Sequence, residues 1–148
     1  MPRLDDAQIA ALVTMASEAR LNAYAPYSQF HVGAALLAAD GRMFSGANVE
    51  NASFGLSLCA ERVAVGAATT AGARSFVAVA VAGGGNQGLL PCGACRQVLA
   101  EFSPNILVLC CGADGTHETR SLRELLASPF SGESFAEPED RESELIAP

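Results

Sequence analysis

The sequence predicts a single α/β domain in which helices cover a mixed β-sheet of about five strands. Three observations lead to this prediction. The chain has 148 residues, the length of one ordinary domain. An early pair of strand-like runs is joined by a hairpin turn. The later strand-like runs alternate with helical segments, and this order implies a mixed sheet covered by helices.

The first part of the chain predicts one helix followed by a strand pair. Apolar residues recur at helical spacing from Asp5 to Tyr24, and Pro26 closes the segment. Two strand-like runs follow at residues 30–38 and 43–48. The turn chemistry of Asp40-Gly41 between them suits a hairpin, so we expect antiparallel pairing.

The rest of the chain predicts helices and buried strands in alternation. The predicted helices cover residues 59–70, 92–102 and 122–127, the second of them after the helix-start signal Pro91. The predicted buried strands cover residues 75–82 and 106–111, and one further strand has room before the last helix. The glycine-rich segment 83–88 predicts a mobile loop.

Composition excludes several classes of function. All nine basic residues are arginines, so a Schiff-base lysine and a phosphate-binding P-loop lysine are absent. The arginines are scattered, unlike the basic patches of nucleic-acid-binding proteins, and we expect no nucleic-acid partner. The formal net charge is −7, but residues 131–148 hold six acidic residues and one arginine. We therefore expect a nearly neutral domain at 1–130 and a flexible acidic tail at 131–148.

The sequence also predicts where the protein resides. No apolar run approaches the roughly 18 residues that a membrane-spanning helix needs, and the acidic Asp5-Asp6 is unlike a signal peptide. The five cysteines are an odd number, and two have Cys-x-x-Cys spacing, which favours metal or redox chemistry over disulfides. We expect a cytoplasmic protein in a reducing compartment, with no membrane partner.

Two short cysteine motifs predict a catalytic zinc site. They are Cys59-Ala60-Glu61-Arg62 and Pro91-Cys92-Gly93-Ala94-Cys95-Arg96-Gln97. Thiolates of Cys59, Cys92 and Cys95 would hold one Zn²⁺ per chain and leave its fourth tetrahedral position for water. Both motifs begin predicted helices, where the positive end of the helix dipole favours thiolates. Glu61 is the candidate proton carrier.

This interpretation makes two demands on the surroundings of the metal. Residues i and i+2 point apart within a regular helix, so Cys59 and Glu61 share a site only if Cys59 lies at or just before the first turn. Three thiolates also give the zinc centre a charge of about −1. Arg62 and Arg96 are the candidates for hydrogen bonds to the cysteine sulfurs that withdraw this charge.

The two motifs match the zinc deaminase signature, in which a His or Cys is followed by x-Glu and later by Pro-Cys-x-x-Cys. Further blocks match one subfamily, namely Ala25-Pro26-Tyr27-Ser28-Gln29-Phe30-His31-Val32-Gly33-Ala34-Ala35-Leu36, Asn48-Val49-Glu50-Asn51-Ala52, and Glu124-Leu125-Leu126 before Phe130. From about Ala23 to Phe130 the chain resembles the small, homotetrameric cytidine deaminases of the three-cysteine type. The resemblance implies their three-layer α/β fold.

The resemblance also implies an activity. It is zinc-dependent hydrolytic deamination of cytidine and 2′-deoxycytidine to uridine and 2′-deoxyuridine, with release of ammonia, as in pyrimidine salvage. An activated water attacks C4 of cytosine, and Glu61 moves its proton to N3 and then helps to protonate the departing amine. The implied partner is a free nucleoside.

Substrate-binding residues follow from the same resemblance. Asn48 and Glu50 correspond to the ribose-binding pair, Phe30 to a ring near the base, and the Ala60 carbonyl to a group that reads the base edge. Phe130 corresponds to an aromatic residue that reaches into a neighbouring subunit's pocket, with active sites at the subunit interfaces of a homotetramer.

The chain departs from the family pattern at two places in this region. Phe54 stands where a tyrosine is common, and Pro129 comes two residues later than usual. Phe54 lacks a hydroxyl, so any hydrogen bond made there across subunits is absent.

Three other interpretations stay open. The substrate could be a modified cytosine nucleoside or a blasticidin-like compound, since such deaminases share the three-cysteine site. A structural zinc-binding module would need a fourth ligand, from His31 or Cys110. A thioredoxin-like oxidoreductase would use Cys92 and Cys95, but it leaves the first motif unexplained.

Overall fold

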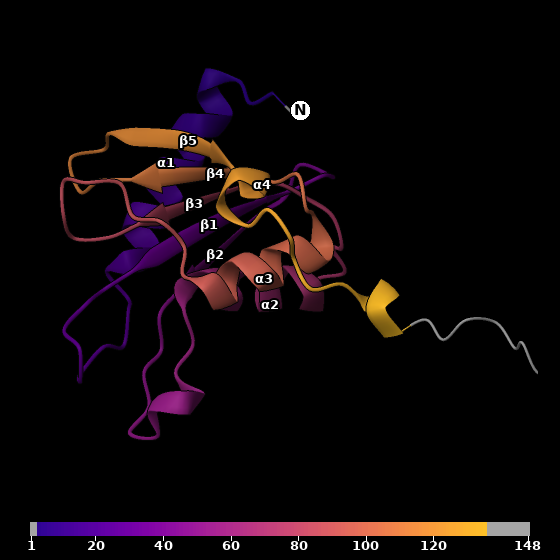
Figure 1. Ribbon diagram of the computed structural model, residues 1–148. Coiled ribbons are helices and arrows are strands. Elements are labelled where there is room, and N and C mark those ends of the chain that lie inside the picture. Colours follow the sequence, from indigo (N-terminus) through magenta and orange to yellow (C-terminus); the bar gives the residue numbers. More distant parts are fainter. Residues whose placement is uncertain (1–2, 136–148) are drawn as a thin grey trace, which may run out of the picture.

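A five-stranded sheet lies between two layers of helices in the computed structural model, which describes residues 3–135 (Figure 1). The strands are β1 (Gly33–Ala38), β2 (Met43–Ala47), β3 (Phe76–Ala82), β4 (Leu107–Cys111) and β5 (His117–Ser121). They lie in the order β2-β1-β3-β4-β5. β3 and β4 are parallel, whereas the other neighbouring pairs are antiparallel, so the sheet is mixed as predicted.

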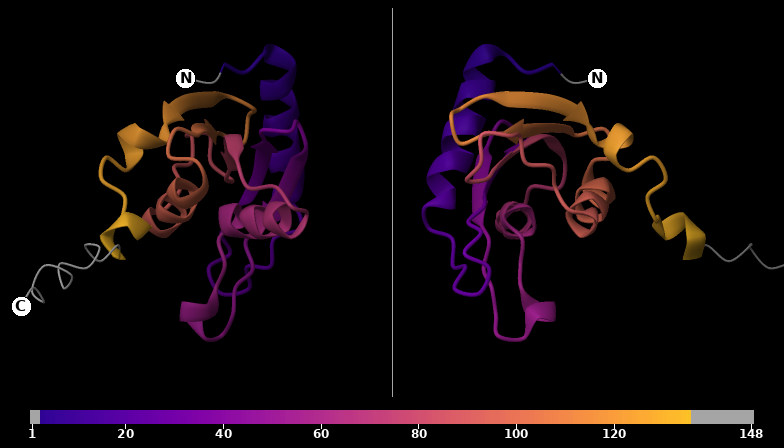
Figure 2. Two further views of the ribbon diagram at one scale, coloured as in Figure 1. Left: turned by 90° about the vertical axis from the view of Figure 1, so that its right-hand side faces the viewer. Right: turned by 60° about the vertical axis from the view of Figure 1, so that its left-hand side comes forward.

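The helices divide between the two faces of this sheet. α1 (Asp6–Arg20) covers one face, and α2 (Ala60–Thr70) and α3 (Gly93–Phe102) cover the other (Figure 2). The short α4 (Leu122–Leu125) follows β5 and contacts α3. The predicted three-layer α/β fold is confirmed. No helix within residues 3–135 has the length and apolar character needed to cross a membrane.

Alternation of side chains along β1 builds the core on both faces of the sheet. Leu36 packs in the cluster beneath α2 and α3 together with Ala64 and Val79. Its neighbour Leu37 packs on the opposite face, in the cluster with Leu12 of α1. Since successive residues of a strand point to opposite faces, burial on both faces requires apolar residues throughout. All six residues of β1 are accordingly buried.

The first helix starts as predicted but ends earlier. Asp5 caps α1 through a reciprocal pair of bonds, since the Gln8 N–H donates to Asp5 Oδ1 at 2.7 Å and the Asp5 N–H donates to Gln8 Oε1 at 3.1 Å. The helix ends at Arg20 rather than Tyr24. Tyr24 pairs instead with the segment after β2, its N–H donating to the Asn48 carbonyl at 2.9 Å and its carbonyl accepting from the Glu50 N–H at 2.8 Å.

Two other predicted boundaries also need correction. The strand predicted at 30–38 begins only at Gly33, because the Asn48 side chain, in the segment after β2, binds the backbone of Phe30 and Val32. The last predicted helix spans Leu122–Leu125 rather than 122–127. Most of the predicted acidic tail, residues 136–148, lies outside the described residues. Its beginning, Gly132–Phe135, forms a short 3-10 helix.

Candidate metal centre and active site

Three cysteines from two helix starts meet where α2 and α3 begin. Cys59 is the N-cap residue of α2 and Cys92 that of α3, while Cys95 is buried in the first turn of α3. Their sulfur atoms all lie within 4.8 Å of one another. Cys59 has an extended backbone, with φ −73° and ψ 153°, and so lies just before the first turn, as the shared site with Glu61 demands.

The cluster fits a zinc ion in spacing and in donor chemistry. Tetrahedral zinc with bonds of about 2.3 Å to sulfur places two thiolates about 3.8 Å apart. The Cys59 and Cys92 sulfurs are 3.8 Å apart. Within residues 3–135 no fourth His, Cys, Asp or Glu joins the group, and His31 and Cys110 lie outside it. Three protein ligands leave one tetrahedral position for water, which is typical of catalytic zinc.

Hydrogen bonds stabilise negative charge on Cys59. The Cys95 thiol, followed by Arg62 and Cys92 as further donors, lowers the pKa of Cys59 to about 5, although partial burial opposes this shift. The bond to Cys59 and burial together raise the pKa of Cys95. Arg62 Nη2 lies 3.7 Å from Cys59 Sγ and also donates to the Ser57 carbonyl at 3.1 Å. The guanidinium therefore lies where the sequence interpretation required a charge-withdrawing donor.

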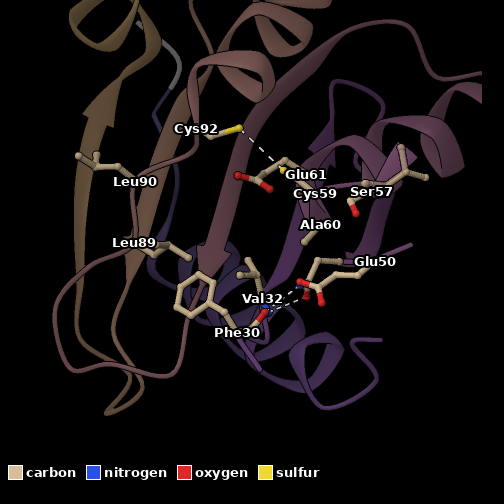
Figure 3. Close-up of a pocket in the computed structure, with 12 residues that line it drawn as sticks. Phe30, Val32, Glu50, Ser57, Cys59, Ala60, Glu61, Leu89, Leu90 and Cys92 are labelled. Carbon is tan, nitrogen blue, oxygen red and sulfur yellow. Dashed lines mark hydrogen bonds between the residues drawn. The ribbon is translucent and has the colours of Figure 1, made fainter. Parts of the chain in front are cut away.

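Glu61 is a buried carboxyl group beside these sulfurs. It lies in the first turn of α2, and only 4% of its surface is exposed. Burial raises its pKa, because desolvation disfavours the charged form, and the negative charge of Cys59 acts in the same direction. Its carboxylate points into the space next to Cys59 and Cys92 (Figure 3). A carboxyl group with a raised pKa is suited to exchange protons near neutral pH.

A cavity of about 270 Å³ extends from this cluster. Twelve residues line it: Phe30, Val32, Asn48, Glu50, Ser57, Leu58, Cys59, Ala60, Glu61, Leu89, Leu90 and Cys92. The sulfur atoms and the Glu61 carboxylate lie towards one end, and Phe30 and Glu50 lie towards the other (Figure 3). The structure thus brings together four of the five predicted substrate-binding residues, and Phe130 is not among the lining residues.

The sequence interpretation missed the apolar walls of this cavity. Leu89 and Leu90 come directly before Pro91-Cys92, and Leu58 comes directly before Cys59. Their position next to the ligands was the available signal, because a residue that precedes a helix N-cap at a metal site necessarily lies close to that site. The walls make the cavity largely apolar between its two polar ends.

Asn48 and Glu50 contact the chain as well as the cavity. The Asn48 side chain accepts from the Val32 N–H at 2.8 Å and donates to the Phe30 carbonyl at 2.8 Å. One Glu50 oxygen accepts from the N–H groups of Tyr27 and Ser28, at 3.0 and 3.1 Å. Both polar residues therefore hold the loop that precedes β1.

Two predicted residues, Ala60 and Arg96, are placed differently from expectation. The Ala60 carbonyl packs against β2, where a Cβ on Gly46 would overlap it, so the carbonyl belongs to the helix–sheet contact. Arg96 donates to the carbonyls of Pro91 and Leu125, at 2.8 and 2.9 Å, rather than to a cysteine sulfur. Two backbone carbonyls thus take up the Arg96 guanidinium. Phe130, which is expected to act in a neighbouring subunit, is 61% exposed and contacts Phe135 edge to face in its own chain.

Comparison of the sequence with known families and proteins agrees with this geometry. Residues 6–111 match the family described as the cytidine and deoxycytidylate deaminase zinc-binding region. A cytidine deaminase of Halalkalibacterium halodurans is 46% identical over 125 residues, covering 84% of this chain and 95% of that protein. A cytidine deaminase of Mycobacterium tuberculosis is 44% identical over 115 residues, covering 78% and 84% of the two chains.

Solved structures agree with the sequence comparison. The crystal structure of cytidine deaminase from Burkholderia pseudomallei superposes with a TM-score of 0.78 at 48% identity, covering 81% of this chain and 97% of that one. The enzyme from Mycobacterium tuberculosis superposes with a TM-score of 0.73 at 42% identity, covering 82% and 95%. The fold, the three-cysteine cluster with its buried glutamate and these similarities together show that the chain belongs to the cytidine and deoxycytidylate deaminase family.

Proposed function

We propose that the protein deaminates cytidine and 2′-deoxycytidine by hydrolysis, producing uridine or 2′-deoxyuridine and ammonia. One observation carries this proposal. The cavity joins a three-cysteine cluster and the buried carboxyl of Glu61 at one end to the polar side chains of Asn48 and Glu50 at the other. A cytosine ring needs the first end for its chemistry, and the attached sugar needs the second for its hydroxyls.

The residues proposed to hold zinc are Cys59, Cys92 and Cys95. Zinc held there would supply Lewis-acid activation of a water molecule, lowering the pKa of that water towards neutrality. Glu61 takes a proton from the attacking water, delivers it to N3 of the base and helps to protonate the amine that leaves C4 as ammonia. Arg62 withdraws charge from Cys59 through its hydrogen bond to the sulfur.

Unused hydrogen-bonding capacity supports sugar binding by Asn48 and Glu50. An ionised carboxylate offers about four acceptor sites, and three protein donors occupy sites on Glu50. The Asn48 amide has used one of its two N–H donors and one acceptor site on its oxygen. The pair therefore retains at least one donor and two acceptors, a set that complements a ribose hydroxyl.

The rest of the proposed binding site surrounds the base. The ring of Phe30 supplies an apolar surface next to it. Ala60 lies at the N-terminus of α2, where N–H groups lack helical partners, and its carbonyl packs against β2. We therefore assign contact with the base edge to the Ala60 N–H in place of its carbonyl.

The charge of the cavity supports a nucleoside substrate rather than a nucleotide. Its described lining includes two carboxylates and no lysine or arginine. A phosphate group at the sugar end would meet the carboxylate of Glu50 without a compensating cation. We propose that phosphorylated cytidine is a poor substrate for this reason.

We propose a homotetramer with active sites at subunit interfaces. Several large apolar side chains near the cavity mouth and beyond are exposed in the single chain, and such surfaces mark interaction sites. Phe54 and Leu56 are 72% and 67% exposed on the loop that projects from the body (Figure 2), and Phe130 is 61% exposed. Phe130 is absent from the lining of the cavity in its own chain. It would instead enter the cavity of a neighbouring subunit.

The remaining proposals concern context. We propose one catalytic domain at residues 1–130 followed by the acidic tail at 131–148. We also propose a cytoplasmic role in pyrimidine salvage, in which uridine re-enters nucleotide synthesis.

Activity on a panel of substrates tests the proposed function. Zinc-loaded protein is incubated with cytidine, 2′-deoxycytidine, cytidine 5′-monophosphate and blasticidin S, and ammonia release is measured for each. Turnover of the two nucleosides with little turnover of the monophosphate is expected. Turnover of blasticidin S alone would instead support the alternative activity, since the three-cysteine site is common to both classes.

A further inference from the structure

The loop between α1 and β1 is folded around the carboxylate of Glu50. One carboxylate oxygen accepts from the N–H groups of Tyr27 and Ser28, at 3.0 and 3.1 Å. The other accepts from the Ser28 hydroxyl at 2.5 Å. Hydrogen bonds to an ionised acceptor are shorter and stronger than neutral ones. A charged side chain from the segment after β2 thus fixes the backbone of a loop more than twenty residues earlier in the chain.

The Ser28 hydroxyl connects this carboxylate to Phe30. It gives its only proton to Glu50, and its oxygen accepts from the Phe30 N–H at 3.0 Å. Gln29, between them, has φ 58°, a left-handed conformation that is uncommon for a residue with a Cβ. Its N–H donates to the Ala25 carbonyl at 3.0 Å. Such a conformation persists only where surrounding contacts hold it.

Asn48 holds the other side of the same residue. Its Nδ2 donates to the Phe30 carbonyl at 2.8 Å. Both backbone polar groups of Phe30 are therefore bound by side chains, the N–H by Ser28 and the carbonyl by Asn48. The ring itself lines the cavity but is 49% exposed, so packing alone does not fix it. Its position at the cavity wall depends on this polar support.

We propose that Ser28 is a positioning residue for substrate binding, because it transmits the anchoring by Glu50 to the backbone of Phe30 and so sets the ring against the base. The proposal rests on the proposed function in naming the base as the ligand. Ser28 is not among the residues that line the 270 Å³ cavity. Its effect on the substrate therefore passes through Phe30 and Glu50.

The electrostatics of Glu50 agree with this arrangement. The hydrogen bond from the Ser28 hydroxyl, followed by that from the Ser28 N–H, lowers the pKa of Glu50. The loop thus keeps the carboxylate ionised, and the ionised carboxylate in turn holds the loop. Removal of the Ser28 hydroxyl therefore weakens both the ionisation of Glu50 and the anchoring of the loop.

Three variants test the proposal. Ser28→Ala removes the hydroxyl, Ser28→Thr retains one, and Ser45→Ala deletes a hydroxyl from an exposed position on β2 that does not line the cavity. Since the hydroxyl acts on binding rather than on chemistry, Ser28→Ala should raise the KM for cytidine roughly ten-fold and change kcat by less than about three-fold. Ser28→Thr should restore most of the wild-type KM, and Ser45→Ala should match wild type.

A second readout is independent of activity. The chain contains no tryptophan and two tyrosines, and Tyr27 lies in this loop. Near-ultraviolet circular dichroism of the tyrosines therefore reports on loop order without substrate. Ser28→Ala should reduce this signal, and Ser28→Thr should retain it.

The outcomes separate the two proposals. A Ser28→Ala variant with wild-type KM, or a raised KM that Ser28→Thr does not restore, overturns the role of Ser28. If the wild-type protein deaminates no cytosine nucleoside, the proposed function fails. In that case the tyrosine signal still tests whether Ser28 orders the loop. An unchanged spectrum in Ser28→Ala overturns the positioning role of Ser28.

Discussion

Gln97 binds both backbone polar groups of Phe130. Its Nε2 donates to the Phe130 carbonyl at 2.8 Å, and its Oε1 accepts from the Phe130 N–H at 3.0 Å. The side-chain amide thereby pairs with the Phe130 backbone as a neighbouring β-strand would. It fixes the backbone at Phe130, whose aromatic side chain is largely exposed. Gln97 follows Cys95 by two residues on α3, so the same helix holds a proposed zinc ligand and the proposed intersubunit aromatic residue.

In the proposed homotetramer, loss of this amide should weaken substrate binding. Gln97→Ala should raise the KM for cytidine several-fold, because Phe130 loses two hydrogen bonds that orient it, each contributing about 1 kcal/mol. Zinc content should stay at the wild-type level. Steady-state kinetics measure the effect, and Gln87→Ala in the exposed glycine-rich loop is the matched control. If Phe130→Ala impairs activity while Gln97→Ala does not, the amide has no role in presenting the ring.

Glu61→Gln should abolish most turnover without unfolding the protein. The amide keeps the size of the side chain but cannot carry the proton, and a general acid–base group contributes about 10²–10⁴-fold to rate. Stability should not fall, because burial disfavours the charged carboxylate that the substitution removes. The measurements are kcat, zinc content and the thermal unfolding midpoint. Near-normal turnover in a pure sample would refute the proton-carrying role.

Cys92→Ala should lose zinc. Only two thiol ligands remain in that variant, and two ligands hold the metal far more weakly than three. Metal analysis after dialysis against a mild chelator measures the effect. Cys110→Ala is the matched control, because Cys110 is a buried cysteine of β4 outside the cluster, and its zinc content should be unchanged. Full zinc occupancy in Cys92→Ala would show that another residue provides the third ligand.

The contact between β2 and α2 should tolerate no added side-chain atom. A Cβ on Gly46 would overlap the Ala60 carbonyl and the Ala64 N–H of α2, so Gly46→Ala should destabilise the fold by about 1–3 kcal/mol or more. Gly66→Ala is the matched control within α2, since a Cβ there meets no atom within 4 Å. The control should stabilise the helix by roughly 0.5–1 kcal/mol. Denaturant unfolding measures the free energy of unfolding of both variants. Equal stability of Gly46→Ala and Gly66→Ala would contradict the close contact between β2 and α2.

The cysteine cluster could be predicted because its information is local. Cys59 and Cys92 each begin a helix, and the spacing from Cys92 to Cys95 places two thiols on one turn. The demand that Cys59 precede the first turn followed from helix geometry alone, and the structure meets it. Motifs and periodicity also gave the buried strands, because β1, β3 and β4 consist almost entirely of apolar residues.

Features that depend on distant partners could not be predicted in the same way. The helical pattern runs on to Tyr24, but the backbone of Tyr24 forms hydrogen bonds with the backbone of Asn48 and Glu50 instead. The strand pattern begins at Phe30, but Asn48 binds the backbone of Phe30 and Val32. β5 is a polar edge strand with most residues exposed, so it lacks the apolar signal of the others. At Tyr24 and Phe30, tertiary hydrogen bonds override the local preference.

Arg96 illustrates the same limit within a motif. Its place next to Cys95 suggested a bond to sulfur, but neighbouring residues on a helix point about 100° apart, and its guanidinium reaches Pro91 and Leu125 instead. Arg62 follows Cys59 by three residues, a separation that brings side chains together, and it does approach the sulfur. Spacing along the helix therefore predicts which arginine approaches a sulfur atom. Being next to a cysteine in the sequence does not.

Measurement of both products from cytidine tests the central claim most directly. Zinc-loaded protein is incubated with cytidine, uridine and ammonia are quantified together, and the Glu61→Gln variant serves as the blank. We expect one ammonia for each uridine, with the variant reduced by about 10²–10⁴-fold. No release of ammonia from a protein that carries one zinc per chain would contradict the assignment of this site to cytidine deamination.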